Sequence, residues 1–223
     1  PGDLQRHMIM RRGKKNMSKG VLTVVSGFSG AGKGTVMKRL LEKYDDYALS
    51  VSVTTRAPRP GEEDGIAYFF RSREEFEQLI REDALIEYAQ YVENYYGTPR
   101  SYVEEQLSAG RNVILEIEIQ GAMKVKEKIP EALLVFVTPP TVAELEKRLK
   151  GRGTETDQVI ADRLARAGEE AKGMDQYDYI LVNDDVEECV DHLHDIIVSE
   201  HSRASRNIDF IEDIQRQTKA FQK

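Results

Sequence analysis

Short apolar runs along the chain alternate with stretches in which apolar residues recur every three or four positions. Most of these runs are compatible with buried strands, and the run at 49–53 alternates apolar and polar residues strictly. The predicted strands lie at 21–26, 49–53, 112–119, 132–138 and 178–183. Strands separated by helical stretches predict an α/β fold, in which helices flank both faces of a mostly parallel sheet.

Several helix ends are marked by local chemistry. A serine or threonine followed three residues later by glutamate forms a capping box, which satisfies N–H groups at the start of a helix. Threonine before proline is a second start signal, and glycine after a helical stretch marks an end. These signals are Ser72 with Glu75, Thr141 with Glu144, Thr98 before Pro99, and Gly110.

One long region interrupts the alternation. Residues 54–97 are rich in Tyr, Arg and Glu, and they predict a small α+β lobe inserted between core elements. A glycine- and charge-rich break at 149–157 has the composition of a mobile lid. We expect a tag or disordered extension at 1–16, a core at 17–53 and 98–200 with a lid at about 150–160, the inserted lobe at 54–97, and a helical extension at 201–223.

The extension at 201–223 carries no motif. Its apolar residues Ile208, Ile211 and Ile214 recur at helical spacing. Two roles are open from the sequence: the extension packs on the core, or it mediates association into a homo-oligomer.

Composition narrows the range of partners. The formal charge of −7 disfavours nucleic acid but allows a small phosphorylated ligand, because such a ligand needs only a local cluster of cations. No apolar run is long enough to cross a bilayer and no segment resembles a signal peptide, so we expect a cytoplasmic protein that binds no membrane. Cys189 is the single cysteine and therefore forms no intrachain disulfide. His192 and His194 lie two apart on a predicted helix and make a poor pair of metal ligands.

The segment 27–35 reads GFSGAGKGT and lies between a predicted strand and a predicted helix. Its glycines let backbone N–H groups approach phosphate oxygens, and the helix N-terminus adds partial positive charge. Lys33 supplies a mobile cation for β- and γ-phosphates. This context favours a phosphate-binding loop, or P-loop, over a glycine-rich turn with an unrelated lysine.

Gly34 stands where such loops usually carry a hydroxyl group, which comes one residue later, at Thr35. Either Thr35 approaches Mg²⁺, or ATP oxygens and water hold the ion, in keeping with the reluctance of Mg²⁺ to shed water. The order G-K-G-T is familiar in nucleoside monophosphate kinases, and it favours that group over GTPases.

Two arginines follow in a proline-stiffened loop. Arg56 and Arg59 lie three apart, and Pro58 and Pro60 prevent a helix there. Two planar guanidinium groups at a rigid spacing suit a phosphate, which accepts two bonds from each. The alternative is local pairing with the acidic residues at 62–64, since surface ion pairs are common.

Glu87 lies in the predicted strand 85–91, on the face that also carries Leu85 and Ala89. A carboxylate among apolar neighbours needs a partner, and the N1–H and N2 amine of guanine offer two adjacent donors. Adenine cannot offer both, so such a site would reject it. The alternative is an ion pair with a nearby arginine such as Arg81.

The chain resembles guanylate kinase over roughly residues 17–200. The resemblance rests on SGFSGAGKGT, SVTTRAPRPGEEDGIAYFF, LIEYAQYVENYYGTP, LEIEIQGA, LKGRGTET and VNDD, in this order and at these spacings. It implies the reaction of ATP with GMP to give ADP and GDP, by direct in-line transfer on a P-loop core, with Mg²⁺ as cofactor.

The resemblance also implies roles for individual residues. The GMP-binding residues would be Ser52, Arg56, Arg59, Tyr68, Glu87, Tyr96, Thr98 and Glu116. The ATP-binding residues would be Gly27, Ser29, Gly30, Ala31, Gly32, Lys33, Gly34, Thr35, Asn183 and Asp184. The catalytic residues would be Lys33, Arg56, Arg148, Arg152 and Arg163. Cations on both sides of the transferring group suit a reaction that depends on positioning and charge stabilisation.

Two positions depart from the family pattern. Phe28 replaces a proline, which removes no ligand but alters the stiffness of the loop. Glu118 stands where aspartate is frequent, and its extra methylene displaces a carboxylate that could order Mg²⁺-bound water. Rival interpretations are a non-catalytic scaffold domain, disfavoured by Lys33 and the arginines, and an AMP kinase, disfavoured by Ser52 and Glu87.

Overall fold

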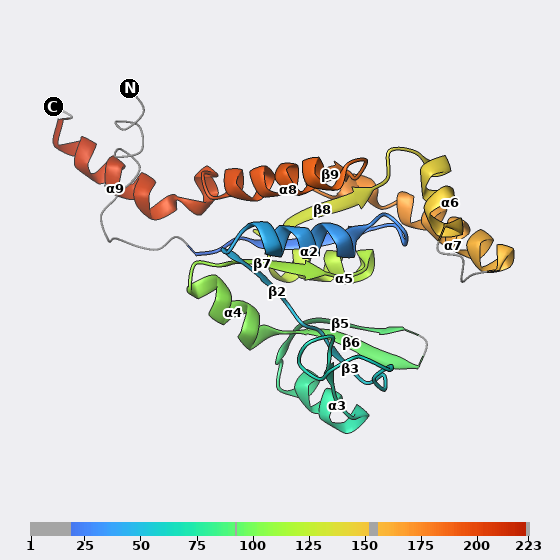
Figure 1. The fold of residues 1–223 in the computed structure, drawn as a ribbon. Coiled ribbons are helices and arrows are strands. Elements are labelled where there is room, and N and C mark those ends of the chain that lie inside the picture. Colours follow the sequence, from blue (N-terminus) through green and yellow to red (C-terminus); the bar gives the residue numbers. More distant parts are fainter. Residues whose placement is uncertain (1–18, 92, 152–155, 222–223) are drawn as a thin grey trace.

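The computed structural model describes residues 19–91, 93–151 and 156–221. Its larger sheet has five parallel strands in the order β2, β7, β1, β8, β9 (Figure 1). The strands are β1 (Leu22–Gly27), β2 (Tyr47–Leu49), β7 (Asn112–Glu116), β8 (Leu133–Thr138) and β9 (Tyr179–Val182). The predicted α/β class with a mostly parallel sheet is confirmed, and β1 is its central strand.

Helices cover both faces of this sheet, so its inner strands are buried on both sides and read as continuous apolar runs (Figure 1). α2 and α8 lie side by side on one face, while α4 and α5 lie on the other. α6 and α7 lie beyond the end of β8. The helices are α2 (Lys33–Lys43), α4 (Arg100–Ser108), α5 (Ile119–Lys128), α6 (Val142–Lys150), α7 (Asp157–Ala171) and α8 (Val186–Glu200), with a short 3₁₀ helix η1 (Met174–Gln176) before β9.

Polar and aromatic contacts join α2 to α8. Lys43 Nζ lies 2.5 Å from a carboxylate oxygen of Asp191, and the rings of Tyr44 and His194 stack with centroids 3.7 Å apart. His194 also shares a 2.8 Å hydrogen bond with the Tyr47 hydroxyl. Cys189 is buried in α8, and burial raises the pKa of its thiol to about 11, so it serves as packing.

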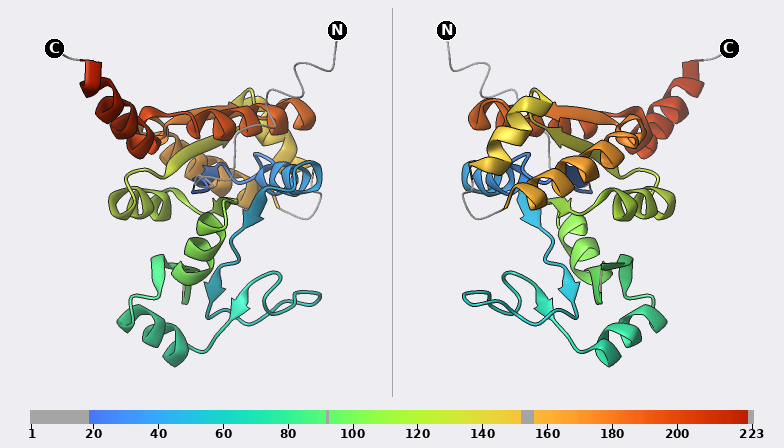
Figure 2. Two further views of the ribbon diagram at one scale, coloured as in Figure 1. Left: turned by 90° about the vertical axis from the view of Figure 1, so that its left-hand side faces the viewer. Right: turned by 90° about the vertical axis from the view of Figure 1, so that its right-hand side faces the viewer.

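A second sheet of four strands forms a smaller lobe that projects from one side of the parallel sheet (Figures 1 and 2). β3 pairs with β4 in parallel and with β6 antiparallel, and β5 pairs with β6 antiparallel. Its elements are β3 (Val53–Thr54), β4 (Phe69–Phe70), α3 (Arg73–Arg81), β5 (Leu85–Tyr91) and β6 (Asn94–Pro99). Val53, Phe76 and Leu85 form a buried cluster separate from the main core.

Two predicted strands need correction. The run at 49–53 is divided between the sheets, because β2 ends at Leu49 and β3 begins at Val53. The run at 112–119 is a strand only to Glu116, where its register with β1 ends, and α5 begins at Ile119. Alternating apolar and acidic residues suit a strand and the approach to a helix equally well, so this pattern alone could not place the boundary.

The predicted helix ends are mostly confirmed. Ser72 and Glu75 form a complete capping box, and the Thr141 hydroxyl accepts a hydrogen bond from the Glu144 N–H. Gly110 has a left-handed φ of 80° just after α4, as expected for a helix end. The prediction that Thr98 caps α4 is wrong, because Thr98 lies within β6 and Pro99 is the residue at the cap.

The chain beyond α8 turns away from the body of the molecule (Figures 1 and 2). It forms η2 (Ala204–Arg206), α9 (Ile208–Thr218) and η3 (Lys219–Phe221). The Asn207 amide holds the bend by donating to the carbonyls of His201 and Arg203, both at 2.9 Å. No residue of α9 is buried, so this structure does not place the predicted extension helix on the core. No helix in the described ranges is both long and apolar enough to cross a membrane.

A substitution in the buried cluster of the small lobe should destabilise this lobe without destabilising the parallel sheet. Phe76 is fully buried in its cluster, so Phe76→Ala should cost about 3–5 kcal/mol, much of what a lobe this small can gain by burial. We expect hydrogen exchange to accelerate over residues 53–99 while β1, β7 and β8 keep their protection. Ile66→Ala, at an exposed position in the same lobe, is the control. Equal loss of protection in both sheets would show a single cooperative unit.

Candidate active site

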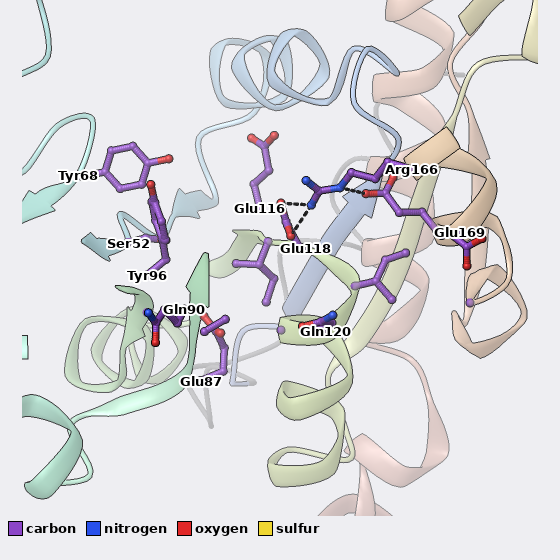
Figure 3. Close-up of a pocket in the computed structure, with 17 residues that line it drawn as sticks. Ser52, Tyr68, Glu87, Gln90, Tyr96, Glu116, Glu118, Gln120, Arg166 and Glu169 are labelled. Atoms are coloured by element: carbon purple, nitrogen blue, oxygen red, sulfur yellow. Dashed lines mark hydrogen bonds and ion pairs between the residues drawn. The ribbon is translucent and has the colours of Figure 1, made fainter. Parts of the chain in front are cut away.

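A pocket of about 800 Å³ opens between the two sheets (Figure 3). One wall comes from the small lobe and the other from the end of β7, the start of α5, and α7. The lining residues are Ser52, Tyr68, Glu87, Ala89, Gln90, Tyr96, Gly97, Glu116, Ile117, Glu118, Ile119, Gln120, Gly121, Arg166, Glu169, Glu170 and Gly173. Ser52, Tyr68, Glu87, Tyr96 and Glu116, which the sequence predicted as GMP-binding, therefore meet in one place.

Glu87 is the most buried carboxylate of this pocket, with 5% of its surface exposed. The Thr98 hydroxyl donates a 2.8 Å hydrogen bond to its Oε1. Burial raises the pKa of Glu87, and the Thr98 bond and the positive charges of Lys124 and Lys128 oppose that rise. Within the described residues no ion pair joins Glu87 to Arg81, so the alternative of a salt bridge is not what holds it.

Gly121 keeps the second oxygen of Glu87 accessible. A Cβ atom at this position, in the first turn of α5, would lie 3.1 Å from Glu87 Oε2. Any side chain would therefore crowd the carboxylate from the pocket side. Sequence reasoning gave Gly121 no role, because the contact depends on the packing of α5 against β5, two elements distant in the chain.

The arginine loop is organised by Glu62. The guanidinium Nη2 of Arg56 lies 2.9 Å from Glu62 Oε1. The backbone N–H of Arg59 donates to the other oxygen, Glu62 Oε2, at 2.7 Å. The guanidinium group of Arg56 also lies over the ring of Tyr68, 5.3 Å from its centroid. Local pairing, the alternative considered from the sequence, is thus present at Arg56, although the Arg59 side chain is exposed and neither arginine lines the pocket.

Tyr68 and Tyr96 connect this loop to the pocket. Their ring centroids are 6.0 Å apart, and both rings line the pocket wall formed by the small lobe (Figure 3). Burial raises the pKa of Tyr68, with the Tyr96 ring hydroxyl contributing in the same direction, so Tyr68 stays a neutral donor.

The segment 27–35 forms a loop between β1 and α2, as predicted. Gly30 and Gly32 have left-handed φ values of 94° and 88°, which glycine adopts without strain, and Gly32 caps α2. The Lys33 ammonium group donates to the Gly27 carbonyl at 2.8 Å and to the Phe28 carbonyl at 3.3 Å. Gly34 and Thr35 are exposed in the first turn of α2.

Asn183, which directly follows β9, supports the loop 27–35 through a hydrogen bond to its backbone. It is buried, its amide donates to the Ala31 carbonyl at 2.8 Å, and a Cβ on Gly32 would lie 2.5 Å from that amide nitrogen. Asp184 is exposed beside it, and Asp185 caps α8 by accepting from the Glu188 N–H at 3.0 Å. The VNDD segment therefore connects β9 to α8 and also holds the loop 27–35 in place.

Of the arginines predicted to form the lid, Arg163 contacts the phosphate loop and Arg148 does not. Arg163, on α7, reaches the loop and donates to the Ser29 hydroxyl at 3.2 Å. Arg148, on α6, pairs with Glu144 one turn earlier, with Nε 2.9 Å from Oε1. Arg152 lies outside the described residues.

Arg166 is a pocket residue that sequence reasoning missed. One nitrogen of its guanidinium group lies 2.8 Å from both carboxylate oxygens of Glu118, and its Nε lies 3.1 Å from Glu170 (Figure 3). Among the described residues that line the pocket, Arg166 is the only cation, whereas several are glutamates. Its position three residues after Arg163, on the same side of a helix, was the available signal.

The fold and this arrangement define a P-loop phosphotransferase: a phosphate loop follows the central strand of a parallel sheet, and a pocket opens between that sheet and the small lobe. A family model described as guanylate kinase matches residues 19–200. The chain therefore belongs to the guanylate kinase family.

Individual relatives agree with this assignment. The guanylate kinase of Oceanobacillus iheyensis is 53% identical over 188 residues, which cover 84% of this chain and 91% of that protein. The guanylate kinase of Streptococcus thermophilus is 54% identical over 191 residues, covering 85% and 91%. The crystal structure of guanylate kinase from Anaplasma phagocytophilum superposes with a TM-score of 0.68 at 36% identity, covering 85% of this chain and 90% of that one.

Removing the Thr98 hydroxyl should raise the pKa of Glu87 further, because that hydrogen bond favours the charged carboxylate. We expect Thr98→Val to move the carboxyl titration to higher pH in NMR spectra of the side-chain carbon. Since the folded pKa exceeds the unfolded one, Glu87 supports folding most at low pH, and this support fades as pH rises through the folded value. T98V should extend that window upward.

Thr55→Val is a matched control, because Thr55 bonds Asn94 and Tyr95 in the same lobe without touching Glu87. A Glu87 titration that T98V leaves in place would contradict the assigned role of the hydroxyl.

Proposed function

We propose that the pocket between the sheets holds GMP while the loop at 27–35 holds ATP. The enzyme phosphorylates GMP to GDP with ATP as phosphoryl donor, as the family assignment indicates. The observation that carries this arrangement is the buried Glu87 carboxylate, which opens onto a pocket beside a complete phosphate loop. The chemistry of each group supports a division of roles among the surrounding residues.

Guanine would be selected by Glu87. Its Oε1 accepts one bond from Thr98 and keeps a second lone pair, and Oε2 lies beside Gly121, so the two oxygens together would accept the N1–H and N2 amine of the base. Ser52, on the same pocket wall, offers a hydroxyl that can donate or accept. An adenine in this position would leave the carboxylate unpaired, and that cost underlies discrimination between the bases.

The GMP phosphate would be bound by Arg56, Arg59, Tyr68 and Tyr96. A dianionic phosphate competes well with a single carboxylate for a guanidinium group, so Arg56 would exchange Glu62 for the substrate. The two tyrosine hydroxyl groups donate from the pocket wall. Glu116 is the last residue of β7 and lines the same pocket, where it would border the reacting phosphates.

The ATP phosphates would be cradled by backbone N–H groups of Gly27, Ser29, Gly30, Ala31, Gly32, Gly34 and Thr35. Lys33 would leave the carbonyl groups of Gly27 and Phe28 for the β- and γ-phosphates. Asn183 would hold the loop in place, and the exposed Asp184 would face the adenine.

Mg²⁺ would be held mainly by ATP oxygens and water, with Thr35 as the protein ligand. The described residues contain no group of three or more His, Cys, Asp or Glu side chains that could hold a metal, whereas the Thr35 hydroxyl is exposed in the first turn of α2. Such a sparse site fits an ion that keeps several waters. Glu118 is held by Arg166 and would act through those waters. Bound Mg²⁺ would neutralise charge on the transferring phosphoryl group.

Arg148, Arg152 and Arg163 would close over the transferring group. Phosphoryl transfer needs both nucleotides in line, water excluded, and positive charge along the path of the γ-phosphoryl group. Arg163 already touches the loop through Ser29, so a small shift of α7 would bring its guanidinium group to the phosphates.

A coupled assay of ADP formation tests the function directly. We expect ADP only when ATP and GMP are both present, with AMP a poor substitute. Lys33→Met should lower kcat by about 10²–10³-fold, as loss of one electrostatic stabiliser does in other enzymes, while the fold is retained by circular dichroism. ADP formation independent of GMP, or equal rates with AMP, would refute the proposal. No turnover by the pure protein would favour a scaffold domain.

Glu87→Gln should damage the use of GMP far more than that of ATP, because an amide nitrogen would face the guanine donors. We expect kcat/KM for GMP to fall about hundredfold with KM for ATP nearly unchanged. The GMP affinity of the native enzyme should fall as pH drops through the raised pKa of Glu87, and E87Q should lack this fall. Glu169→Gln, an exposed glutamate of the same pocket, is the matched control. Equal losses for both nucleotides would exclude a base-reading role.

A further inference from the structure

Arg166 joins α7 to the opposite wall of the pocket. Its Nη2 lies 2.8 Å from each carboxylate oxygen of Glu118, which directly precedes α5, and its Nε lies 3.1 Å from Glu170 on α7 itself (Figure 3). A planar guanidinium group can hold two carboxylates at a fixed spacing in this way, whereas the point charge of a lysine cannot. Arg166 has no part in the proposed binding of GMP or ATP, so its position needs an explanation of its own.

The same helix also contacts the phosphate loop. Arg163 lies three residues before Arg166, on the same side of α7, and donates to the Ser29 hydroxyl at 3.2 Å. Contacts with the loop and with the pocket wall are therefore about one helical turn apart. Because a helix is a rigid element, a displacement of α7 at one contact is passed to the other.

The pocket wall is in turn bonded to the strand that carries the loop. Ser26, near the end of β1, donates its hydroxyl to the Ile117 carbonyl at 2.7 Å. Ile117 adjoins Glu118, and Gly27 at the end of β1 begins the loop. The contacts thus form a closed ring, which runs from the loop through α7 to the pocket wall and back through β1.

The charges of the pocket make the position of Arg166 important for phosphorylated ligands. In the described structure four glutamates besides Glu87 line the pocket, and a phosphate brought near them would be repelled. Arg166 offsets the charge of Glu118 and bonds Glu170. Burial raises the pKa of Glu170, and the positive charges of Arg166 and of Lys33 in the loop oppose that rise, so this carboxyl group is within electrostatic reach of both.

The pair of Arg166 and Glu118 is not fixed by burial. The two side chains are 40% and 67% exposed, and exposed ion pairs contribute little to folding stability. Such a pair can adjust when the pocket fills, and its loss should not unfold the chain. We therefore look for its effect in the balance between arrangements of α7 rather than in the stability of the fold.

We propose that Arg166 is a positioning residue that couples the two nucleotide sites, because its contact with Glu118 holds α7 against the pocket wall. The inference rests on the proposed function, which places GMP in the pocket and ATP on the loop. The first nucleotide orders α7 and the wall together, and the second then binds to an arrangement that is already formed. Coupling of this kind is reciprocal, so each nucleotide raises the affinity of the other by the same factor.

Isothermal titration calorimetry of the full chain measures this factor, as the ratio of the GMP dissociation constants without and with saturating AMP-PNP and Mg²⁺. We expect a ratio of about five or more in the native chain and about one in Arg166→Met. The ratio divides out any effect of the lost charge on the binding of GMP alone. Lys172→Met is the matched control, since it removes a cation just after α7 that pairs with Glu169 at 2.6 Å, and it should keep the native ratio.

Glu118→Gln tests whether Arg166 acts through Glu118. Two residues that act through one contact give the same loss alone and together. We therefore expect E118Q and the double variant R166M/E118Q to show the same ratio near one as R166M. A native ratio in E118Q would overturn the proposal, because Arg166 would then act without Glu118.

Thermal unfolding is the check on the fold: R166M should lower Tm by no more than about 4 °C, because the pair is exposed. A native ratio near one overturns the proposal, as does a ratio that R166M leaves unchanged. GMP binding without AMP-PNP reports on the proposed function separately. If the native chain does not bind GMP, the proposed function and the coupling both fail, whereas GMP binding with a ratio that ignores R166M overturns the coupling alone.

Discussion

The burial of one carboxylate, that of Glu87, is the constraint on which the rest of the site depends. An unpaired charge in such surroundings costs several kcal/mol, so the fold must either supply a partner or leave room for one. It does both: Thr98 bonds one oxygen, and Gly121 leaves the other facing the pocket. The contact of α5 with β5, which brings Gly121 to Glu87, also joins the two sheets. In the proposed function, base selection and the joining of the lobes therefore share one set of contacts.

The parallel sheet and the small lobe differ in how they are stabilised, and this difference fits the roles proposed for them. The parallel sheet is buried on both faces and carries the phosphate loop on its central strand, where displacement would spoil the cradle. In the described part of the chain, the separate cluster of the small lobe contains three buried apolar residues, and its strands pair only with one another. In the proposed function, a rigid site for the phosphoryl donor and a less stable site for the acceptor would allow the second to move over the first.

Sequence reasoning succeeded where chemistry is local. The glycine loop, the capping box at Ser72 and the strand of Glu87 each depend on residues close together in the chain, and all lie where they were predicted. It failed where a side chain has two competing partners. Thr98 was expected to cap a helix, but its hydroxyl satisfies a buried charge 11 residues away. Arg166 was overlooked because its partner Glu118 lies 48 residues distant, and only the fold brings α7 close to the residue that precedes α5.

The ion pair between Arg56 and Glu62 has a consequence for small guanine compounds that lack a phosphate. While Glu62 occupies the guanidinium group, the loop is already ordered and electrically balanced. A nucleoside such as guanosine brings no anion with which to displace that carboxylate, so it would gain contacts at the base alone. In the proposed function Glu62 would therefore hold the place of the substrate phosphate and would yield only to a stronger anion, so the pocket would discriminate against unphosphorylated guanine compounds.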